Sequence, residues 1–357
     1  MPSINSLQVI GSKGFGGAEQ WFQRFSLALA DLGHPPELVV RRGYELDGDH
    51  WRGLTRHSLP MRTVWDPVSK HEISRLIRRR RPDIVQTYMG RATRLTRPPR
   101  RWNILHVARL GGYYKVDGFR HAHAWIGNTK GICDHLVRAG LPARRVFHIY
   151  NFAELPAPGP VSPELRARLG IPTDAWVLLT PGRLVPKKGH RILMDALARL
   201  PHTVAGRPIW QIVLGDGPLS VSLQAQATAL DIDGRIVWCG WIHDPDPYYR
   251  LADLVVFPSE QSEPFGNVII EAWAYAKPLV TSASLGAQEI ARDEENALFF
   301  DCGSPADLAT AIRRALEDDA GTATLGQNGR RRAERVFSRE SVMQTYVDVY
   351  RYLIARR

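Results

Sequence analysis

One segment in the second half of the sequence combines arginine and lysine in a way that suits an anionic ligand. Arg183 and Lys188 follow the apolar run Trp176–Thr180 and precede a helical pattern at about 190–200. Arginine presents a planar fork to phosphate oxygens, whereas lysine presents a mobile point charge. If the apolar run is a strand, these side chains lie at its carboxyl end. A solvated basic loop is the alternative interpretation.

A second segment adds two carboxylates, Glu263 and Glu271, which are eight residues apart. They bracket Gly266 and Asn267, where a loop opens into a helix. Because a helix rises ~1.5 Å per residue, we expect the two carboxylates about 10 Å apart. The N–H groups of the helix N-terminus between them attract an anion. This spacing suits a ligand with hydroxyl groups at both ends and a diphosphate in the middle, as in a nucleotide sugar.

A glycine-rich stretch at residues 11–19 lies between the apolar run Leu7–Ile10 and a helical pattern. Glycines let the backbone approach a ligand, and the helix N-terminus favours an anion. The spacing differs from the Gly-x-Gly-x-x-Gly of dinucleotide sites, and the Gly-Lys-Ser/Thr ending of a triphosphate-binding loop is absent. We expect phosphate or substrate to lie near Gly16 and Gly17. A purely structural strand-to-helix turn is the alternative.

Both halves of the chain alternate short apolar runs with helical patterns. The strands expected in the first half are Leu7–Ile10, Glu37–Val40, Asp83–Thr87, Ile104–Ala108, Ala124–Gly127 and Val146–Ile149. Those expected in the second half are Trp176–Thr180, Ile209–Leu214, Arg235–Cys239, Leu254–Phe257, Leu279–Thr281 and Ala297–Phe300. This alternation predicts an α/β fold of two Rossmann-like domains, each with a parallel sheet covered by helices. Ligands of such sheets bind at the carboxyl ends of the strands, so we expect the domains to face each other across a cleft that holds the site.

Length and charge both divide the chain in two. A chain of 357 residues suggests two domains. Residues 1–152 hold 25 Lys and Arg against 11 Asp and Glu, whereas residues 153–357 hold 22 against 25. Alternating prolines in 155–160 block helix and central strand close to this change. We therefore expect domains at 1–152 and 153–337, and a closing amphipathic helix at 338–357 that packs on its own domain or crosses back to the first.

The composition excludes several classes of protein. A hydrophobic share of 44% and a charged share of 23% argue against disordered, collagen-like and coiled-coil chains. Three cysteines without a Cys-x-x-Cys pair argue against a disulfide framework or a structural zinc site, and favour a reducing compartment. No apolar run is long enough to span a membrane, and the first twenty residues do not resemble a signal peptide. We expect a cytoplasmic protein.

Taken together, the motifs resemble those of the retaining glycosyltransferases of family 4, which have the two-domain GT-B fold and include many enzymes of bacterial cell-surface polysaccharide synthesis. The resemblance covers nearly the whole chain. It rests on Gly16-Gly17-Ala18-Glu19, Ile149–Phe152, Gly182-Arg183-Leu184 with Lys188-Gly189, Gly215–Pro218, and a Glu-x7-Glu motif from Glu263 to Glu271. It implies a hexosyltransferase that moves a sugar from a nucleotide-sugar donor to a glycan or lipid-linked acceptor, with retention, in polysaccharide or lipopolysaccharide synthesis.

The resemblance also implies roles for the site residues. Arg183 and Lys188 would bind the donor diphosphate and neutralise the leaving group, and Glu263 would hold hydroxyls of the transferred sugar. These three are the expected catalytic residues, and Glu271 would hold the ribose hydroxyls. The first domain would bind the acceptor and the second the donor. The other expected donor contacts are Phe265, Gly266 and Asn267, together with Gly16 and Gly17 of the first domain.

The sequence departs from the family where many members carry a histidine after a first-domain strand. The corresponding stretch, 107–115, has no histidine, and His106 lies slightly too early. We therefore assign no catalytic histidine. Arg109, Tyr113 and Lys115 are the acceptor-side candidates to approach the reacting groups.

Two Asp-x-Asp triplets, Asp231–Asp233 and Asp244–Asp246, have a form that binds Mn²⁺ or Mg²⁺ in a different transferase fold. The first lies at an expected helix end and the second in a proline-rich turn, so we interpret both as solvated loops. Positive groups arranged around a diphosphate can stabilise its departure without a metal. We expect neither a metal nor a cofactor.

Ten arginines lie between residues 75 and 101, five of them in Arg75 and Arg78–Arg81. A solvated helix end is one interpretation. The other is a basic patch that holds a cytoplasmic enzyme at the anionic inner membrane surface. A nucleic-acid-binding protein is a further alternative, but no nucleic-acid motif accompanies the charge. A sugar phosphorylase or an epimerase on the same fold is the alternative enzyme.

Overall fold

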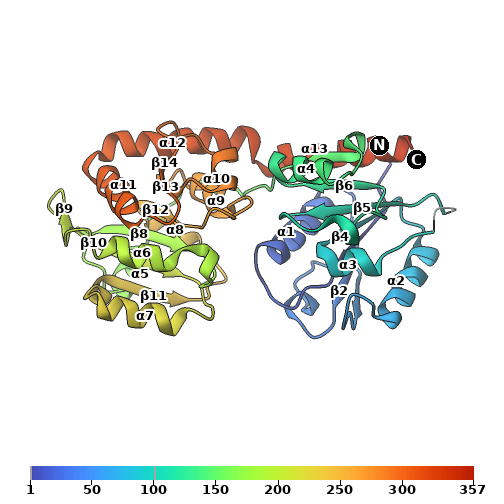
Figure 1. Cartoon of the computed structure of the whole chain (residues 1–357), viewed down its shortest axis with the longest axis horizontal. Helices are drawn as coiled ribbons and strands as arrows, with labels where there is room; N and C mark the ends of the chain where they lie inside the picture. The colour runs from blue at the N-terminus through green and yellow to red at the C-terminus, as the bar shows by residue number, and fades with distance from the viewer. Residues whose placement is uncertain (1, 100–101) are drawn as a thin grey trace. The chain divides into compact units, whose positions relative to one another are not determined.

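The computed structural model describes residues 2–99 and 102–357, which divide into two compact units. The first contains the chain up to Asn151 together with Arg339–Arg357, and the second is Phe152–Ser338. Each unit holds one parallel sheet covered by helices (Figure 1). The predicted α/β fold with two Rossmann-like domains is thereby confirmed. Arg100 and Arg101, two of the ten clustered arginines, lie outside the described residues.

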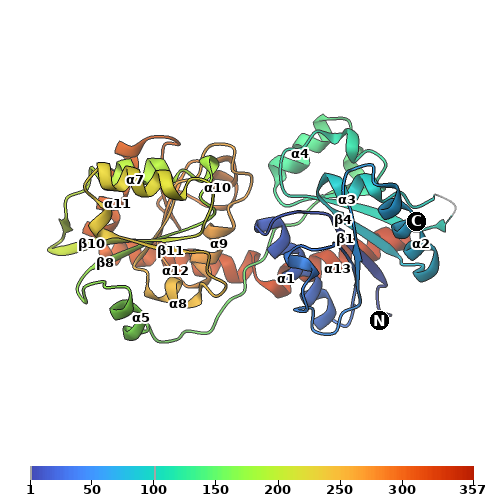
Figure 2. The same ribbon diagram turned by 90° about the horizontal axis from the view of Figure 1, so that it is seen from below.

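The sheet of the first unit has the strand order β3-β2-β1-β4-β5-β6-β7, with every neighbouring pair parallel. Its strands are β1 (Ser6–Ile10), β2 (Glu37–Arg41), β3 (Arg56–Leu59), β4 (Ile84–Tyr88), β5 (Leu105–Leu110), β6 (Ala124–Gly127) and β7 (Val146–His148). Its helices are α1 (Gly17–Asp31), α2 (Pro67–Arg80), α3 (Met89–Leu95), α4 (Lys130–Arg138) and α13 (Arg339–Ala355). In Figure 2, α3 lies on one face of this sheet, and α1 and α13 lie on the other.

The sheet of the second unit has the order β11-β10-β8-β12-β13-β14 and is likewise parallel, with the short β9 added antiparallel to β10. Its strands are β8 (Trp176–Pro181), β9 (Thr203–Val204), β10 (Arg207–Leu214), β11 (Ile236–Gly240), β12 (Leu254–Phe257), β13 (Leu279–Ser282) and β14 (Leu298–Phe300). Its helices are α5 (Pro163–Arg168), α6 (His190–Leu197), α7 (Ser220–Ala229), α8 (Asp246–Leu251), α9 (Asn267–Ala274), α10 (Leu285–Ile290), α11 (Pro305–Glu317) and α12 (Asp319–Val336).

The largest core of the second unit lies on one face of its sheet. Leu193 of α6, Leu223 of α7 and Leu308 of α11 pack there against buried strand residues such as Leu178 and Val213. Helices α8, α9 and α12 lie on the opposite face (Figure 2). Because both faces are covered, the central strands β8 and β12 are mostly apolar, as is usual in parallel sheets.

Helix α13 belongs to the first unit, where it packs against α1. Its buried stripe carries Tyr346 and Tyr350, as its amphipathic pattern requires. The ring of Tyr346 lies 4.7 Å from that of Phe25, and the hydroxyl of Tyr350 donates to Gln86 Oε1 at 2.9 Å. The last helix of the chain thus completes the core of the first unit.

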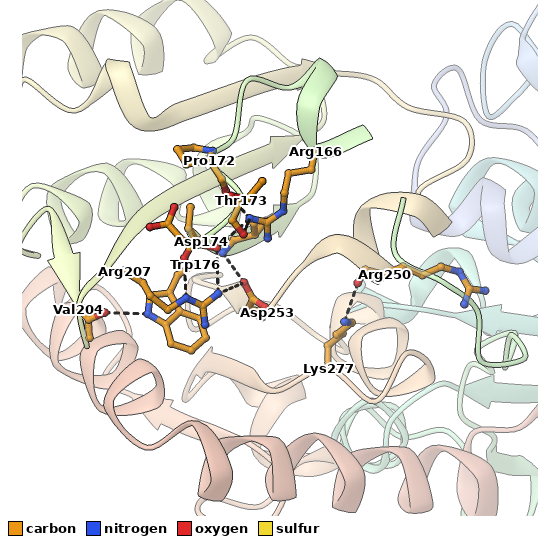
Figure 3. Close-up of polar contacts among 12 residues, drawn as sticks. Arg166, Pro172, Thr173, Asp174, Trp176, Val204, Arg207, Arg250, Asp253 and Lys277 are labelled. Atoms are coloured by element: carbon orange, nitrogen blue, oxygen red, sulfur yellow. Dashed lines mark hydrogen bonds and ion pairs between the residues drawn. The ribbon is translucent and has the colours of Figure 1, made fainter. Parts of the chain in front are cut away.

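A group of charged side chains lies at the amino ends of the strands of the second sheet (Figure 3). The Arg207 guanidinium lies over the Trp176 ring at 3.4 Å and donates to the carbonyl of Asp174. The Asp253 carboxylate accepts from the backbone N–H of Val177 at 2.8 Å, and its burial raises the pKa of this group. Arg166 donates to three carbonyls of the turn before β8. These contacts hold the turn in place at the edge opposite the carboxyl ends of the strands.

Candidate functional site

Three loops of the second unit meet at the carboxyl ends of β8, β10 and β12, and glycines make their contact possible. Gly189 has φ +69°, and a Cβ there would lie 1.8 Å from the carbonyl oxygen of Pro258, just after β12. At Gly215, just after β10, a Cβ would lie 2.0 Å from the carbonyl oxygen of Gly182. No side chain fits at either position. The loop after β8 is therefore packed between its two neighbours, and Arg183 and Lys188 lie on it.

Lys188 and Glu263 come together in this loop cluster. The Nζ of Lys188 lies 2.9 Å from Glu263 Oε2, although the two residues are 75 positions apart. Their side chains are 18% and 9% exposed, and Lys188 also lies over the Phe257 ring. Such a pair is charge-assisted and weakly screened by solvent. Lys188, which we expect to bind the diphosphate, and Glu263, which we expect to bind the sugar, are therefore direct neighbours.

Arg183 lies in the same loop, but its side chain is exposed. Within residues 2–99 and 102–357, its guanidinium forms no ion pair. It is therefore available to an anion that reaches this edge of the sheet. Its backbone is fixed by Leu184, whose N–H donates to the carbonyl of Asp216 at 3.0 Å.

His190, the first residue of α6, lies buried behind this loop. Neither ring nitrogen makes a hydrogen bond of ordinary geometry. Burial and the neighbouring Lys188 cation lower the pKa of His190 to about 4. The imidazole is therefore neutral at physiological pH. Sequence reasoning gave this residue no role, because a histidine at the start of a helix carries no motif of its own.

Helix α9 begins at the end of the loop that follows β12, the loop that carries Glu263. Gly266 precedes it with φ +88°, and a Cβ there would lie 2.8 Å from the Phe257 ring. Phe265 is buried, while Asn267 is half-buried at the first helical position. The N-terminus of α9 therefore directs its N–H groups and dipole to the edge of the sheet where Lys188 lies.

Glu271 lies in the second turn of α9 and is half-buried. Its Oε2 accepts a hydrogen bond of 3.0 Å from the hydroxyl of Tyr249 in α8. The predicted ribose-binding carboxylate is thus held by a side chain that sequence reasoning did not single out. A buried tyrosine in a helix has the appearance of ordinary core, and only the packing of α8 on α9 reveals the contact.

The glycine-rich stretch of the first unit joins β1 to α1. Gly16 is the N-cap residue of α1 and Gly17 its first residue, with no side chain capping the helix. Glu19 is buried in the first turn, whereas Lys13 is exposed. An uncapped helix N-terminus next to glycine backbone is compatible with an anion there.

The three acceptor-side candidates are placed differently from one another. Arg109, at the end of β5, is buried, with its guanidinium 4.5 Å from the Trp21 ring. It donates to Asn151 Oδ1 and, at 3.2 Å, to the Tyr346 hydroxyl. Tyr113 and Lys115 are exposed beyond the strand. The structure therefore brings Arg109 into the core of the first unit and leaves the other two at its surface.

The histidines near this strand are buried or half-buried. His106 in β5 is fully buried, and its Nε2 lies 3.0 Å from the Thr87 hydroxyl. Burial lowers its pKa well below the ordinary value. His121 and His123 are half-buried, and His121 contacts the carbonyls of Thr93 and Thr96. All three serve packing and hydrogen bonding.

The two aspartate triplets lie on the surface. Asp231, Asp233 and Asp244 are exposed, and Asp246 is paired with Arg250 in α8 at 2.6 Å. Within residues 2–99 and 102–357, no group of three or more His, Cys, Asp or Glu side chains is arranged to hold a metal ion. None of the helices described is both long and apolar enough to cross a bilayer.

Two family models match the chain, and together they cover most of it. The model described as Glycosyl transferases group 1 matches residues 161–332, within the second unit. The model described as Glycosyltransferase Family 4 matches residues 15–155, mainly in the first. The two matches thus meet near the change from one unit to the other.

Curated relatives resemble the chain over its whole length. The lipopolysaccharide core biosynthesis glycosyltransferase LpsE of Rhizobium meliloti (strain 1021) is 33% identical over 347 residues, which are 94% of this chain and 95% of LpsE. LpsD, a protein of the same description and organism, is 29% identical over 346 residues, 96% of this chain and 97% of LpsD.

Solved structures share the fold at low identity. Anabaena HepE in complex with UDP and glucose has a TM-score of 0.83 and 22% identity, covering 97% of this chain and 99% of HepE. WaaG, a glycosyltransferase involved in lipopolysaccharide biosynthesis, has a TM-score of 0.76 and 18% identity, covering 97% of this chain and 99% of WaaG. These structures extend the likeness in sequence to the arrangement of the elements.

Proposed function

This chain belongs to the glycosyltransferases of the group 1 and family 4 type, and from that membership we propose that it moves a hexose from a nucleotide sugar to a glycan or lipid-linked acceptor in lipopolysaccharide or related cell-surface polysaccharide synthesis. The full-length likeness to LpsE and LpsD supports this acceptor class. The HepE complexes with UDP and UDP-glucose make UDP-sugars the first donors to test. The second unit is proposed to bind the donor, and the first the acceptor.

The observation that carries the proposal is the loop cluster around Lys188 and Glu263. Their ion pair at 2.9 Å, the exposed Arg183 and the N-terminus of α9 converge on the carboxyl ends of the second sheet. Ligands of such sheets bind at this edge. Positive charge for a diphosphate and a carboxylate for sugar hydroxyls are thereby available in one place, with Glu271 further along α9.

The reaction breaks the bond between the sugar's anomeric carbon and the diphosphate oxygen, and joins that carbon to an acceptor hydroxyl oxygen. Arg183 and Lys188 would stabilise the negative charge that the leaving nucleoside diphosphate acquires. Glu263 would hold hydroxyls of the transferred sugar, and backbone groups of Phe265–Asn267 would assist. The acceptor hydroxyl gives up its proton to the departing diphosphate oxygen, from which it passes to solvent, and the new bond keeps the anomeric configuration of the donor.

In this proposal, neither a metal nor a cofactor takes part. Two cationic side chains and a helix N-terminus supply the charge that a divalent ion supplies elsewhere. The enzyme works in the cytoplasm, where nucleotide sugars are made, and its first unit contacts the membrane surface that carries the acceptor.

A ligand screen followed by a transfer assay tests the proposal. A ligand that binds only the folded protein raises the melting temperature, so we expect a stabilising shift with one nucleoside diphosphate and its sugar. With that donor and a core oligosaccharide or lipid-linked acceptor, we expect transfer that EDTA leaves unchanged. NMR of the product should show the donor's anomeric configuration. A protein that neither binds nor hydrolyses any nucleotide sugar of a broad panel would overturn the assignment.

A further inference from the structure

Tyr249 fixes the carboxylate of Glu271 from the side of α8. Its hydroxyl donates to Glu271 Oε2 at 3.0 Å, and its side chain is fully buried. A tyrosine hydroxyl that donates to a carboxylate makes a charge-assisted bond, which is stronger than a neutral one. One oxygen of Glu271 therefore has a fixed partner, and the rotation of the carboxylate is restricted.

The tyrosine is itself held by its neighbours. Its ring stacks on that of Tyr275, just beyond the end of α9, with centroids 4.9 Å apart and planes 4° apart. The Tyr275 hydroxyl donates to Asp246 Oδ1 at 3.0 Å, and Arg250 donates to both oxygens of Asp246. The two ends of α8 and the end of α9 are thus tied together around the stacked rings.

A ribose bound at Glu271 would share this carboxylate with Tyr249. A carboxylate offers about four acceptor sites on its two oxygens, and Tyr249 occupies one of them. Vicinal hydroxyls of a ribose need two acceptors in a fixed relation. A glutamate without a partner at its inner side loses side-chain freedom when such a ligand binds, whereas a glutamate already held loses less.

We propose that Tyr249 is a positioning residue that holds Glu271 for the ribose hydroxyls of the donor nucleotide, so that selection of ribonucleotides over deoxyribonucleotides depends on this buried hydroxyl. The inference rests on the proposed function, because it takes a nucleotide as the ligand of Glu271. The inference adds to that site Tyr249 of α8, which acts on the ligand only through the carboxylate of Glu271.

Calorimetric titration with matched nucleotides tests this inference. The probes are UDP, GDP and ADP, with the best binder compared against its 2′-deoxy and 3′-deoxy analogues. The wild type should prefer the ribonucleotide, and Tyr249→Phe should reduce that preference about tenfold, the scale of one hydrogen bond to a charged group. Tyr275→Phe is the matched control: it removes a hydroxyl from the same stack without touching Glu271, and should keep the preference within about twofold.

A double variant separates positioning from packing. Glu271→Ala should abolish the ribose preference, and adding Tyr249→Phe to it should change nothing further, because the carboxylate that Tyr249 holds is gone. In steady-state kinetics, Tyr249→Phe should raise the KM for the donor and leave kcat within about twofold.

The outcomes distinguish this inference from the proposed function. If Tyr249→Phe weakens the ribonucleotide and deoxyribonucleotides equally, its hydroxyl serves packing alone and the inference is overturned while the proposed function stands. A wild type that binds nucleotides without any ribose preference overturns it as well. A wild type that binds no nucleotide overturns both.

Discussion

In the proposed donor site, Lys188 is the residue whose loss we expect to matter most. It faces the buried carboxylate of Glu263 at 2.9 Å. We predict that Lys188→Ala lowers transfer at least ~10²-fold, the scale of one preorganised charge-stabilising group. It should also lower the free energy of unfolding by about 1–3 kcal/mol, because Glu263 is left buried without its cation. Initial rates and urea unfolding measure the two effects.

Lys187 provides the matched control, since it belongs to the same turn and is exposed. Its backbone carbonyl accepts from the N–H of Glu260, a contact that alanine preserves. Lys187→Ala should leave rate and stability close to those of the wild type. Equal losses in both variants would show that general positive charge matters, and not the pair with Glu263.

Residue types and their spacing predicted that cationic side chains and carboxylates lie near each other at one edge of the second sheet. They did not predict which buried side chains contact them. Arg183, Lys188 and Glu263 follow predicted strands, and the carboxyl ends of parallel strands lie at one edge. The partners Tyr249 and His190 are buried residues of helices, whose contacts depend on how α6, α8 and α9 pack. Arg109 shows the same limit, because its place in the core depends on Tyr346, 237 residues later.

At the scale of elements, α9 keeps its place because α12 packs closely against it. A Cβ at Gly329 would lie 2.1 Å from the Trp273 ring, which is fully buried. Gly→Ala within a helix ordinarily gains about 1 kcal/mol in helix propensity. Here the clash with a rigid buried ring outweighs that gain. We predict that Gly329→Ala lowers the free energy of unfolding by about 1–3 kcal/mol, as measured by denaturant titration.

A substitution to alanine at an exposed position of α12 controls for the effect of the added alanine on helix propensity. Gln327→Ala also adds helix propensity but meets no neighbour across the interface, so its stability should stay within about 0.5 kcal/mol of the wild type. If Gly329→Ala proves as stable as Gln327→Ala, the contact between α12 and α9 is more adaptable than its geometry suggests.

Elements were predictable where their sequence pattern reflects burial on both faces. The central strands of both sheets agree with the predicted apolar runs to within about two residues. Strand β3 was not predicted, because Arg56-His57-Ser58-Leu59 lies at the edge of its sheet and needs no apolar run. Helix α12 was also missed, since three glycines and four arginines in Asp319–Val336 conceal a narrow buried stripe.

At the scale of the whole molecule, positive charge is concentrated in the first half of the chain. Several arginines of the cluster have partners: Arg80 pairs with Glu37 at 2.9 Å, and Arg78 and Arg81 lie over the Trp102 ring. Even so, these side chains remain exposed at the end of α2. Trp65, just before α2, is 72% exposed and suits a lipid-water interface.

We predict that this surface binds anionic membranes. Each arginine near an anionic bilayer contributes about 1 kcal/mol, and the attraction decays within a Debye length. The protein should therefore sediment with phosphatidylglycerol liposomes at low salt and be released at high salt. Replacing Arg78–Arg81 by serine should weaken this binding at least about 100-fold. Donor affinity should stay unchanged, because the proposed donor residues belong to the second unit.

The control variant carries the same loss of charge in the second unit, with serine at the exposed positions Arg191, Arg199, Arg331 and Arg335. If membrane attraction follows from total charge alone, both variants lose binding equally. If it follows from the surface around α2, the control keeps most of it, and the rate on a lipid-linked acceptor falls only in the first variant. The membrane hypothesis is wrong if the wild type does not bind anionic liposomes at low salt and is as active on a neutral soluble acceptor as on a lipid-linked one. The arginines would then be a solvated helix end.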